Sequence, residues 1–136
     1  PISSFTLENA LQECRRLSKP GALNIIISDF KHFSPACKKL LHMTKSHGEV
    51  IAIQTFDALE RELPPPGDYP VTDGSHQLQV NTASEKVRAQ FKNLVSNEQA
   101  DLHDAFKNLQ IPLIQMGTEE DAMVKVQQHF SAGGLL

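Results

Sequence analysis

Ser28 and Asp29 end a short apolar run that begins at residue 22, and their oxygens could take part in metal chemistry. The run is rich in β-branched residues, which predicts a strand buried on both faces of a parallel sheet. In open α/β sheets, functional groups gather just beyond the carboxyl ends of the strands. Thr55 and Thr118 lie at the ends of two further expected strands, so both could lie beside Asp29 as ligands.

A metal-dependent hydrolase or phosphatase built on Asp29 would need a second carboxylate at the same strand ends, and Asp57 is the candidate. Mg²⁺ is usually held by one or two carboxylates together with water or substrate oxygens. Asp29 alone would hold such an ion weakly, so we expect no cofactor in the isolated chain. A structural role for Asp29, in which it caps the loop that leads to Ser34, is the favoured alternative.

A group of charged residues follows the second strand and is a candidate binding site. Asp57, Glu60 and Arg61 lie here, with Glu62 beside them. They could form a charged recognition loop, or a local cluster of salt bridges that fixes the crossover. The sequence leaves both interpretations open, and it places Thr118 as a further binding candidate at a neighbouring strand end.

The charge of the chain is unevenly distributed. Residues 14–47 hold seven basic side chains and a single acid, Asp29, so this segment carries a net charge of +6 within a chain of net charge −3. A basic segment can bind an acidic protein or a nucleic acid. Since no aromatic residues interleave with the basic ones, two solvated helix faces are the favoured explanation, and nucleic-acid binding is an unfavoured alternative.

Sequence motifs for catalysis do not stand out. The chain has no Gly-x-Gly-x-x-Gly pattern, no P-loop and no Gly-x-Ser-x-Gly elbow, and its six histidines have no zinc-site spacing. Cys14 and Cys37 fall on expected apolar helix faces, and two lone cysteines favour a reducing cytoplasm. No apolar run approaches the ~18 residues that a membrane span needs. We therefore expect a cytoplasmic binding protein rather than an enzyme.

The periodicity of apolar residues predicts four helices and three strands around a hairpin. Thr6 and Ser34 are expected helix caps, and Gly48 an expected helix end. Thr82 and Glu85 predict a capping box for the long third helix, and Asp73–Gly74 a hairpin turn. The expected elements are helices 6–18, 34–48, 82–109 and 122–130, strands 22–28, 49–56 and 111–116, a connection over 57–66, a hairpin over about 67–81, and a loose tail over 131–136.

This order of elements predicts an α/β fold of three layers. Strands that alternate with helices form parallel sheets with helices on both faces. Three strands make about half of a doubly wound, Rossmann-like sheet, to which the hairpin is an addition. The 136 residues suit one domain with a real core.

Several phrases of the sequence resemble one protein family. They are residues 16–23, 27–30, 57–64 (Asp-Ala-Leu-Glu-Arg-Glu-Leu-Pro) and 80–82, with Arg88 following. These phrases are similar to the bacterial domain-of-unknown-function family fifty-eight, whose members are similar to von Willebrand factor A domains and tend to be encoded beside MoxR-type AAA+ ATPases. The resemblance implies that the chain is the carboxyl-terminal half of such a domain. It also implies a protein-interaction module that works with a MoxR-type ATPase.

The resemblance also bears on metal binding. A-type domains hold a divalent ion with an Asp-x-Ser-x-Ser loop, a threonine, and an aspartate after the fourth strand. Asp29 matches that last aspartate by position, with Ser28 beside it, whereas the Asp-x-Ser-x-Ser pattern is absent from this chain. The resemblance therefore implies Mg²⁺ only for a longer protein that supplies the remaining ligands.

The small sheet also leads to an expectation about assembly. An apolar strand over residues 22–28 that lies at a sheet edge is a template for pairing. We expect a homodimer joined at or near this strand, since two-fold contacts are the commonest closed assemblies. The alternative is that the helix over 6–18 covers the edge and keeps the chain monomeric.

Overall fold

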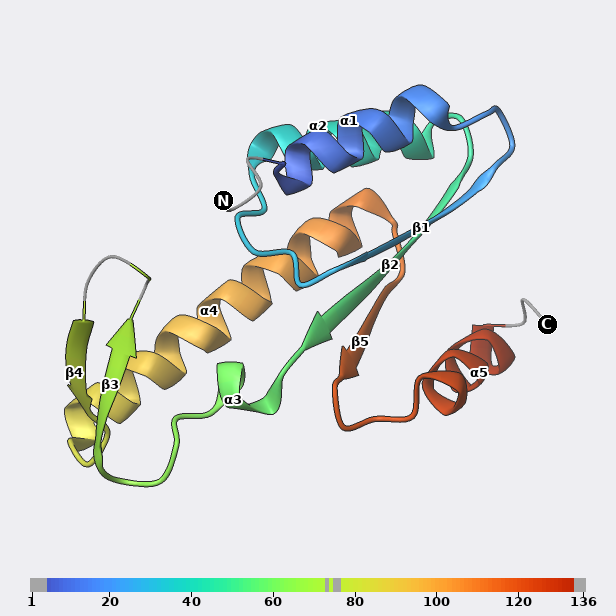
Figure 1. Cartoon of the computed structure of the whole chain (residues 1–136). Coiled ribbons are helices and arrows are strands. Elements are labelled where there is room, and N and C mark those ends of the chain that lie inside the picture. The colour runs from blue at the N-terminus through green and yellow to red at the C-terminus, as the bar shows by residue number, and fades with distance from the viewer. Residues whose placement is uncertain (1–4, 73, 75–76, 134–136) are drawn as a thin grey trace.

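The computed structural model describes residues 5–72, 74 and 77–133, and its element order agrees with the expected one, with one short helix added (Figure 1). None of the helices within these ranges has the length and apolar composition needed to cross a bilayer. The elements are α1 (Leu7–Leu17), β1 (Leu23–Ser28), α2 (Pro35–Lys45), β2 (Glu49–Phe56), α3 (Ala58–Arg61), β3 (Asp68–Thr72), β4 (Gln77–Asn81), α4 (Glu85–Leu109), β5 (Leu113–Gly117) and α5 (Ala122–Gly133).

The first two helices begin where the sequence predicts. Thr6 caps α1, where its hydroxyl oxygen accepts a hydrogen bond of 3.2 Å from the Asn9 N–H. Ser34 caps α2 in the same way, accepting from the Cys37 N–H at 3.2 Å, and Pro35 occupies the first helical position. Proline is tolerated there because its missing N–H has no helical partner to lose.

The central sheet is parallel, in the order β1-β2-β5, as the alternation of helices and strands predicts. β2 lies in the middle and is buried on both faces over most of its length. β1 differs from the prediction. Its side chains alternate between exposed and half-buried, because it has β2 on one side only and one of its faces is uncovered.

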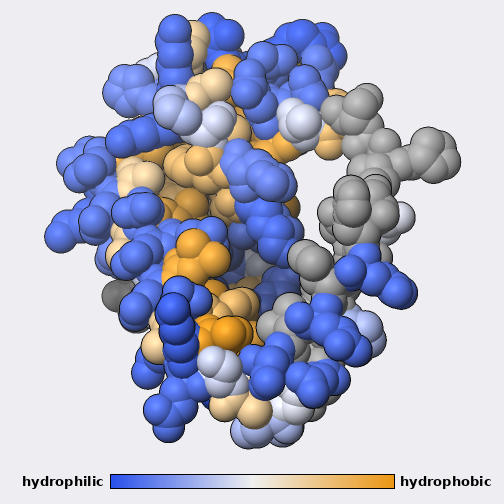
Figure 2. All heavy atoms as spheres, turned by 90° about the vertical axis from the view of Figure 1, so that its left-hand side faces the viewer, coloured by the Kyte–Doolittle hydropathy of each residue, from blue (hydrophilic) through white to orange (hydrophobic). Residues whose placement is uncertain are grey.

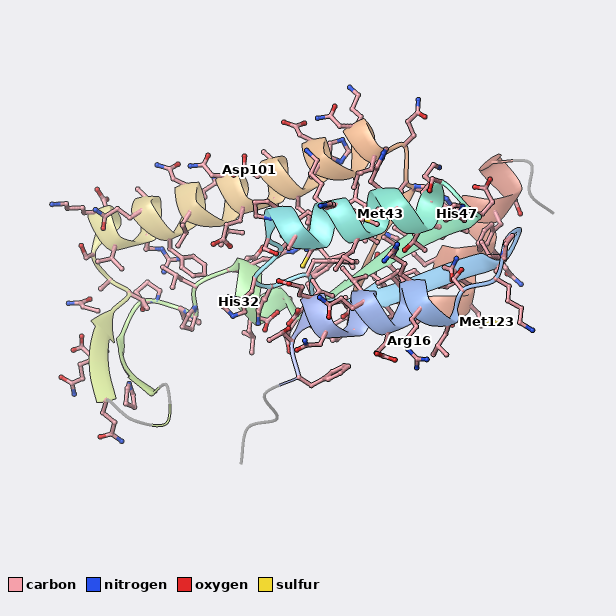
Figure 3. The ribbon with its side chains drawn as sticks, turned by 90° about the horizontal axis from the view of Figure 1, so that it is seen from above. Arg16, His32, Met43, His47, Asp101 and Met123 are labelled. Carbon is pink, nitrogen blue, oxygen red and sulfur yellow. The ribbon has the colours of Figure 1, made fainter. Side chains whose placement is uncertain are left out.

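Helices cover both faces of the sheet, so the chain has the expected three layers. On one face, α1, α2 and the carboxyl-terminal part of α4 form the larger core, and α1 and α2 lie side by side across the sheet (Figure 3). On the other face, α5 contacts β5 through a smaller cluster. The buried residues of the larger core are Leu11, Phe30, Cys37, Leu41, Val50, Ala52, Leu102, Phe106, Leu109 and Ile111, and those of the smaller one are Ile51, Ile53 and Ile114.

The hairpin is a separate antiparallel ribbon at the amino-terminal end of α4, away from the central sheet (Figure 1). Val71 pairs with Leu78 in this ribbon, outside the central sheet. Thr72 pairs with Gln77 at the far end of the ribbon. Of the predicted Asp73–Gly74 turn, Asp73 lies outside the described residues, and Gly74 has a φ of +91°, which glycine adopts without strain.

The predicted capping box of the long helix is wrong. Ser84 is the cap of α4, and its hydroxyl oxygen accepts from the Val87 N–H. Thr82 instead holds the base of the hairpin, since it is almost fully buried and its hydroxyl accepts from the Gly67 N–H at 2.9 Å. Arg88 closes the same junction by donating to the backbone oxygens of Pro64 and Thr82. A sequence pattern for a cap cannot separate two hydroxyl residues that lie two positions apart.

Two further boundaries differ from the sequence prediction. α2 ends at Lys45 with Ser46 as its cap. Gly48 is required for a different reason, because a Cβ there would collide with the Ala22 carbonyl oxygen just before β1. Residues 131–133 of the predicted tail belong to α5, which continues to Gly133. Residues 134–136 lie outside the described residues.

Candidate functional site

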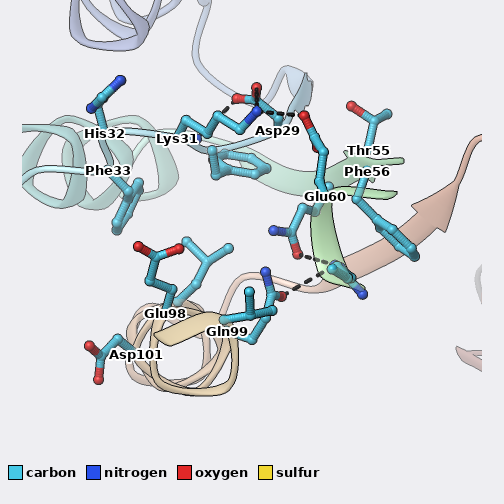
Figure 4. A pocket seen from close by; sticks show the side chains of 15 residues that line it. Asp29, Lys31, His32, Phe33, Thr55, Phe56, Glu60, Glu98, Gln99 and Asp101 are labelled. Carbon is cyan, nitrogen blue, oxygen red and sulfur yellow. Dashed lines mark hydrogen bonds and ion pairs between the residues drawn. The ribbon is translucent and has the colours of Figure 1, made fainter. Parts of the chain in front are cut away.

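A cleft of about 630 Å³ opens where β1 and β2 end. Its walls are the loop after β1, the end of β2, the short helix α3 and the middle of α4 (Figure 4). Figure 2 looks at the side of the molecule toward which β1 and β2 run, and it shows apolar surface in a hollow bordered by hydrophilic side chains. The carboxyl ends of parallel strands are where α/β folds place their sites.

The loop after β1 is held in an unusual backbone conformation. Phe30 and His32 have φ angles of +55° and +59°, a left-handed region that bulky residues rarely adopt. The hydroxyl of Ser28 accepts from the Phe30 N–H, and the carboxylate of Asp29 accepts from the Lys31 N–H, both at 3.0 Å. Buried Phe30 packs edge to face on Phe106 of α4, with ring centroids 5.1 Å apart. Strain of this kind concentrates at functional sites.

Lys31 joins the two carboxylates nearest to it in the cleft. Its ammonium nitrogen lies 2.6 Å from Glu60 Oε1 and 3.7 Å from Asp29 Oδ2. The hydrogen bond from Lys31 lowers the pKa of Glu60, and the same bond raises the pKa of Lys31. A cation of the protein itself therefore occupies the space between Asp29 and Glu60.

The structure separates Asp57 and Thr118 from the cleft. Asp57 caps α3, where its carboxylate accepts from the Leu59 N–H at 3.0 Å. Thr118 is exposed beyond β5, on a neighbouring surface, and its N–H donates to the Phe56 carbonyl oxygen. Asp57 is thus not the second carboxylate beside Asp29, because Glu60 has that position. Within the described ranges, no three His, Cys, Asp or Glu side chains are grouped to hold a metal ion.

Arg61 is fixed in the cleft by an aromatic ring and neutral amides. Its guanidinium carbon lies 3.3 Å from the centroid of the Phe56 ring, a cation–π contact. Its Nη2 donates to the side-chain oxygens of Gln54 and Gln99 at 3.4 and 3.3 Å. Gln115 donates to the same two oxygens at 3.0 Å each, so both acceptors are held in place from the other side.

The positive charge of Arg61 has no close counter-charge in the described part of the chain, where no carboxylate lies within ion-pair distance. Its Nε is buried and has no hydrogen-bond partner. Burial lowers the pKa of the guanidinium, while the more distant Glu120 and Glu60 act in the opposite direction. A half-buried cation whose Nε lacks a hydrogen bond and that has no close counter-charge is a favourable position for an added anion.

The two sides of the cleft differ in charge. Glu98 and Asp101 extend from α4 on the side of the cleft away from Phe56, over which the Arg61 guanidinium lies (Figure 4). One side therefore presents carboxylates, and the other presents the guanidinium. A segment that carries charges of both signs would complement this cleft.

A match to a known family covers β1 to β4 and most of the residues that line this cleft, whereas β5 and α5 lie outside it. The family described as "Protein of unknown function DUF58" matches residues 1–101. The chain belongs to the DUF58 family. No curated protein and no solved structure shows significant similarity to the chain. The DUF58 match includes Asp29, Lys31, Glu60, Arg61 and Gln99.

The residues chosen from the sequence include part of the lining of this cleft. These are Asp29, Glu60 and Arg61, which the fold brings together there. The glutamines that hold Arg61 were missed, because residues 54, 99 and 115 follow no common spacing. Gln54 carried a usable signal, since it is a polar residue in the buried run of β2 and must find a hydrogen-bond partner there.

The basic segment 14–47 is spread over α1, β1 and α2. Three of its seven cations are held by contacts within the DUF58 chain. Arg16 pairs with Glu13 at 2.7 Å, Lys31 pairs with Glu60, and Lys45 donates to the Gln110 carbonyl oxygen.

Proposed function

We propose that this DUF58 chain is a non-catalytic protein-binding module whose partner docks in the cleft at the ends of β1 and β2. The observation that supports this proposal is the state of Arg61. Its guanidinium lies in a fixed position without a close carboxylate, and its only described side-chain acceptors are two long contacts to neutral amides.

An acidic side chain of the partner is the group that would complete this site. Hydrogen bonds between a guanidinium and a carboxylate are about twice as strong as neutral ones and can be bidentate. The bond would also offset the desolvation of Arg61. On the other wall, Glu98 and Asp101 would receive a basic side chain of the same partner, which would fix its orientation.

The partner that we propose is a MoxR-type AAA+ ATPase, which the family resemblance implies. A cytoplasmic location fits such a pair, and it is supported by Cys14 and Cys37, both of which are unpaired thiols. Burial raises the pKa of Cys14, which keeps this thiol protonated and unreactive.

A binding role accounts for the cleft better than a metal-dependent hydrolase does. A divalent ion between Asp29 and Glu60 would have to displace the Lys31 ammonium from its 2.6 Å contact. Asp57, the other carboxylate that such an enzyme would need, is engaged as the cap of α3. The Lys31 contact also gives both carboxylates a structural role in the wall of the cleft.

The test is isothermal titration calorimetry, in which this chain is added to the MoxR-type ATPase of the same organism. Arg61→Met keeps the aliphatic stem and removes the charge. Its former acceptors, Gln54 and Gln99, keep their hydrogen bonds from Gln115, so we expect the variant to fold. Loss of a charge-assisted bond should weaken binding by at least about tenfold.

The matched control is Arg16→Met, whose side chain lies on the exposed face of α1 away from the cleft, and it should change the affinity less than about twofold. Circular dichroism of both variants checks that the fold is retained. Equal binding by wild type and Arg61→Met would refute the docking site. Absence of binding by the wild-type chain would refute the proposed partner.

A further inference from the structure

The cleft at the ends of β1 and β2 is acidic as a whole, although Arg61 gives it one cation without a close counter-charge. Its charged lining side chains are Asp29, Lys31, Glu60, Arg61, Glu98 and Asp101. Four carboxylates thus face two permanent cations, which gives the lining a net charge of −2 when His32 is neutral. A ligand with several negative charges would be repelled by this lining, even though a single carboxylate suits Arg61.

The excess negative charge lies on α4. Lys31 contacts both Asp29 and Glu60, whereas Glu98 and Asp101 have no cation within ion-pair distance in the described part of the chain. Both of these α4 carboxylates are exposed. They are three residues apart, so they lie on one face of the helix as like charges that repel each other weakly. Cationic groups of a ligand would remove this repulsion.

The cleft also offers apolar surface. Phe33, from the loop after β1, and Val95, one turn before Glu98 on α4, line the cleft and are half-buried (Figure 4). Part of each side chain is therefore open to an aliphatic group of a ligand, whose burial would add to the affinity.

We propose that the cleft binds a basic peptide segment that carries a single carboxylate, with this carboxylate on Arg61 and the basic side chains on Glu98 and Asp101. The proposal rests on the proposed function in one respect, which is that the cleft is the docking site. A segment with one glutamate among several lysines or arginines, and with an aliphatic residue, matches both the local cation and the net charge of the lining. A nucleic acid or a phosphorylated segment does not, because its phosphate groups add negative charge to a lining that is already acidic.

Fluorescence anisotropy with three labelled peptides tests this charge pattern. The first peptide has several lysines and a leucine on each side of one glutamate, so that no register has to be assumed. The second has glutamine in place of the glutamate, and the third has every charge inverted. The wild-type chain should bind the first peptide at least about tenfold more tightly than either of the others, because the second lacks the charge-assisted bond and the third is repelled by the lining. Equal binding of the first two peptides, equal or tighter binding of the third, or no binding of any of them would overturn the proposal.

Gln99→Glu gives a sharper test, since it supplies the carboxylate from within the chain. Gln99 Oε1 accepts from Arg61 and from Gln115, and a glutamate has an oxygen in the same position, so we expect the variant to fold. The new carboxylate would neutralise Arg61. The preference for the glutamate peptide over the glutamine peptide should therefore disappear. A preference that keeps its wild-type size would overturn Arg61 as the residue that binds the carboxylate.

The acidic side of the cleft is tested by a matched pair of variants on the same helix. Glu98→Gln should weaken the binding of the first two peptides equally, by about two- to fivefold, as for the loss of an exposed ion pair. Glu85→Gln removes the same charge about 20 Å away along α4, which is beyond the Debye length, and should leave both affinities unchanged. Equal effects of the two variants would contradict a position for the basic side chains at Glu98.

The outcomes separate this proposal from the choice of partner. If the peptides follow the expected order and the MoxR-type ATPase does not bind, the partner is refuted and the class of segment stands. If the ATPase binds in a manner that depends on Arg61 and the peptides do not follow that order, the class of segment alone is refuted.

Discussion

Replacement of Phe106 by alanine should destabilise the chain more than any other single truncation in α4. Phe106 is 1% exposed and its ring meets those of Phe30 and Phe33 at centroid distances of 5.1 and 5.5 Å. A buried Phe→Ala change costs about 3–5 kcal/mol, and the two aromatic contacts keep this site from the lower end of that range, so we expect about 4 kcal/mol. Since small domains are stable by about 5–15 kcal/mol, the variant should keep about 1–11 kcal/mol of its free energy of unfolding.

Urea denaturation followed by far-UV circular dichroism measures the effect. With an m value of about 2 kcal/mol per molar urea, 4 kcal/mol lowers the midpoint by about 2 M. The matched control is Leu94→Ala on the same helix, which is 57% exposed and should change the free energy of unfolding by less than about 0.5 kcal/mol. A Phe106→Ala midpoint within about 0.5 M of wild type would refute the inference that the aromatic cluster anchors α4 to the sheet.

Two further predictions concern the strand junction and the cleft wall. Gly48→Ala should lower the free energy of unfolding by about 1–3 kcal/mol, because its Cβ meets the Ala22 carbonyl oxygen, a backbone atom that cannot move aside. The control is Gly21→Ala, where an added Cβ has no atom within 4 Å, so only the milder strain of the positive φ should lower the stability. An equal loss of unfolding free energy in both variants would contradict the collision at Gly48. Glu60 has a lowered folded-state pKa, so its pair with Lys31 stabilises the fold above the ordinary pKa of 4.5 and loses this effect as the pH falls below it. Because the pair is exposed, Glu60→Gln should lower the free energy of unfolding by less than about 1 kcal/mol at pH 7 and leave it unchanged near pH 3. Urea denaturation midpoints at the two pH values measure this difference. A loss of stability that persists at pH 3 would show that the effect does not come from the charge of Glu60.

The elements were predictable wherever local chemistry decides them. A hydroxyl followed by proline at Ser34 fixes the start of α2, and the β-branched run before Gln54 fixes β2. α3 was missed because four residues are too few for a helical period to show. β1 was predicted as buried on both faces, since an apolar strand has the same composition whether or not a neighbour covers it.

The cleft was predictable only in outline. The rule that sites lie beyond strand ends located Asp29, and the charged phrase 57–64 located Glu60 and Arg61. The contact of Lys31 with both carboxylates depends on the turn with positive φ at Phe30 and His32, which no residue preference indicates. The neutral surroundings of Arg61 come from three distant parts of the chain, and side chains so far apart in sequence meet only through the tertiary fold.

The length of α4 has a mechanical consequence. Its 25 residues span about 37 Å, yet its buried residues, Leu102, Phe106 and Leu109, all lie in the last third. The amino-terminal end holds the hairpin through Arg88. If the helix moves as a rigid body, it rotates about its buried end near Leu102, and the hairpin is at the moving end. Gln99 lies about 5 Å from the pivot and Glu85 about 25 Å, so a hairpin displacement of about 5 Å moves Gln99 by about 1 Å. A partner bound to the hairpin would therefore shift Gln99, one of the two acceptors of Arg61, by a small fraction of the hairpin displacement.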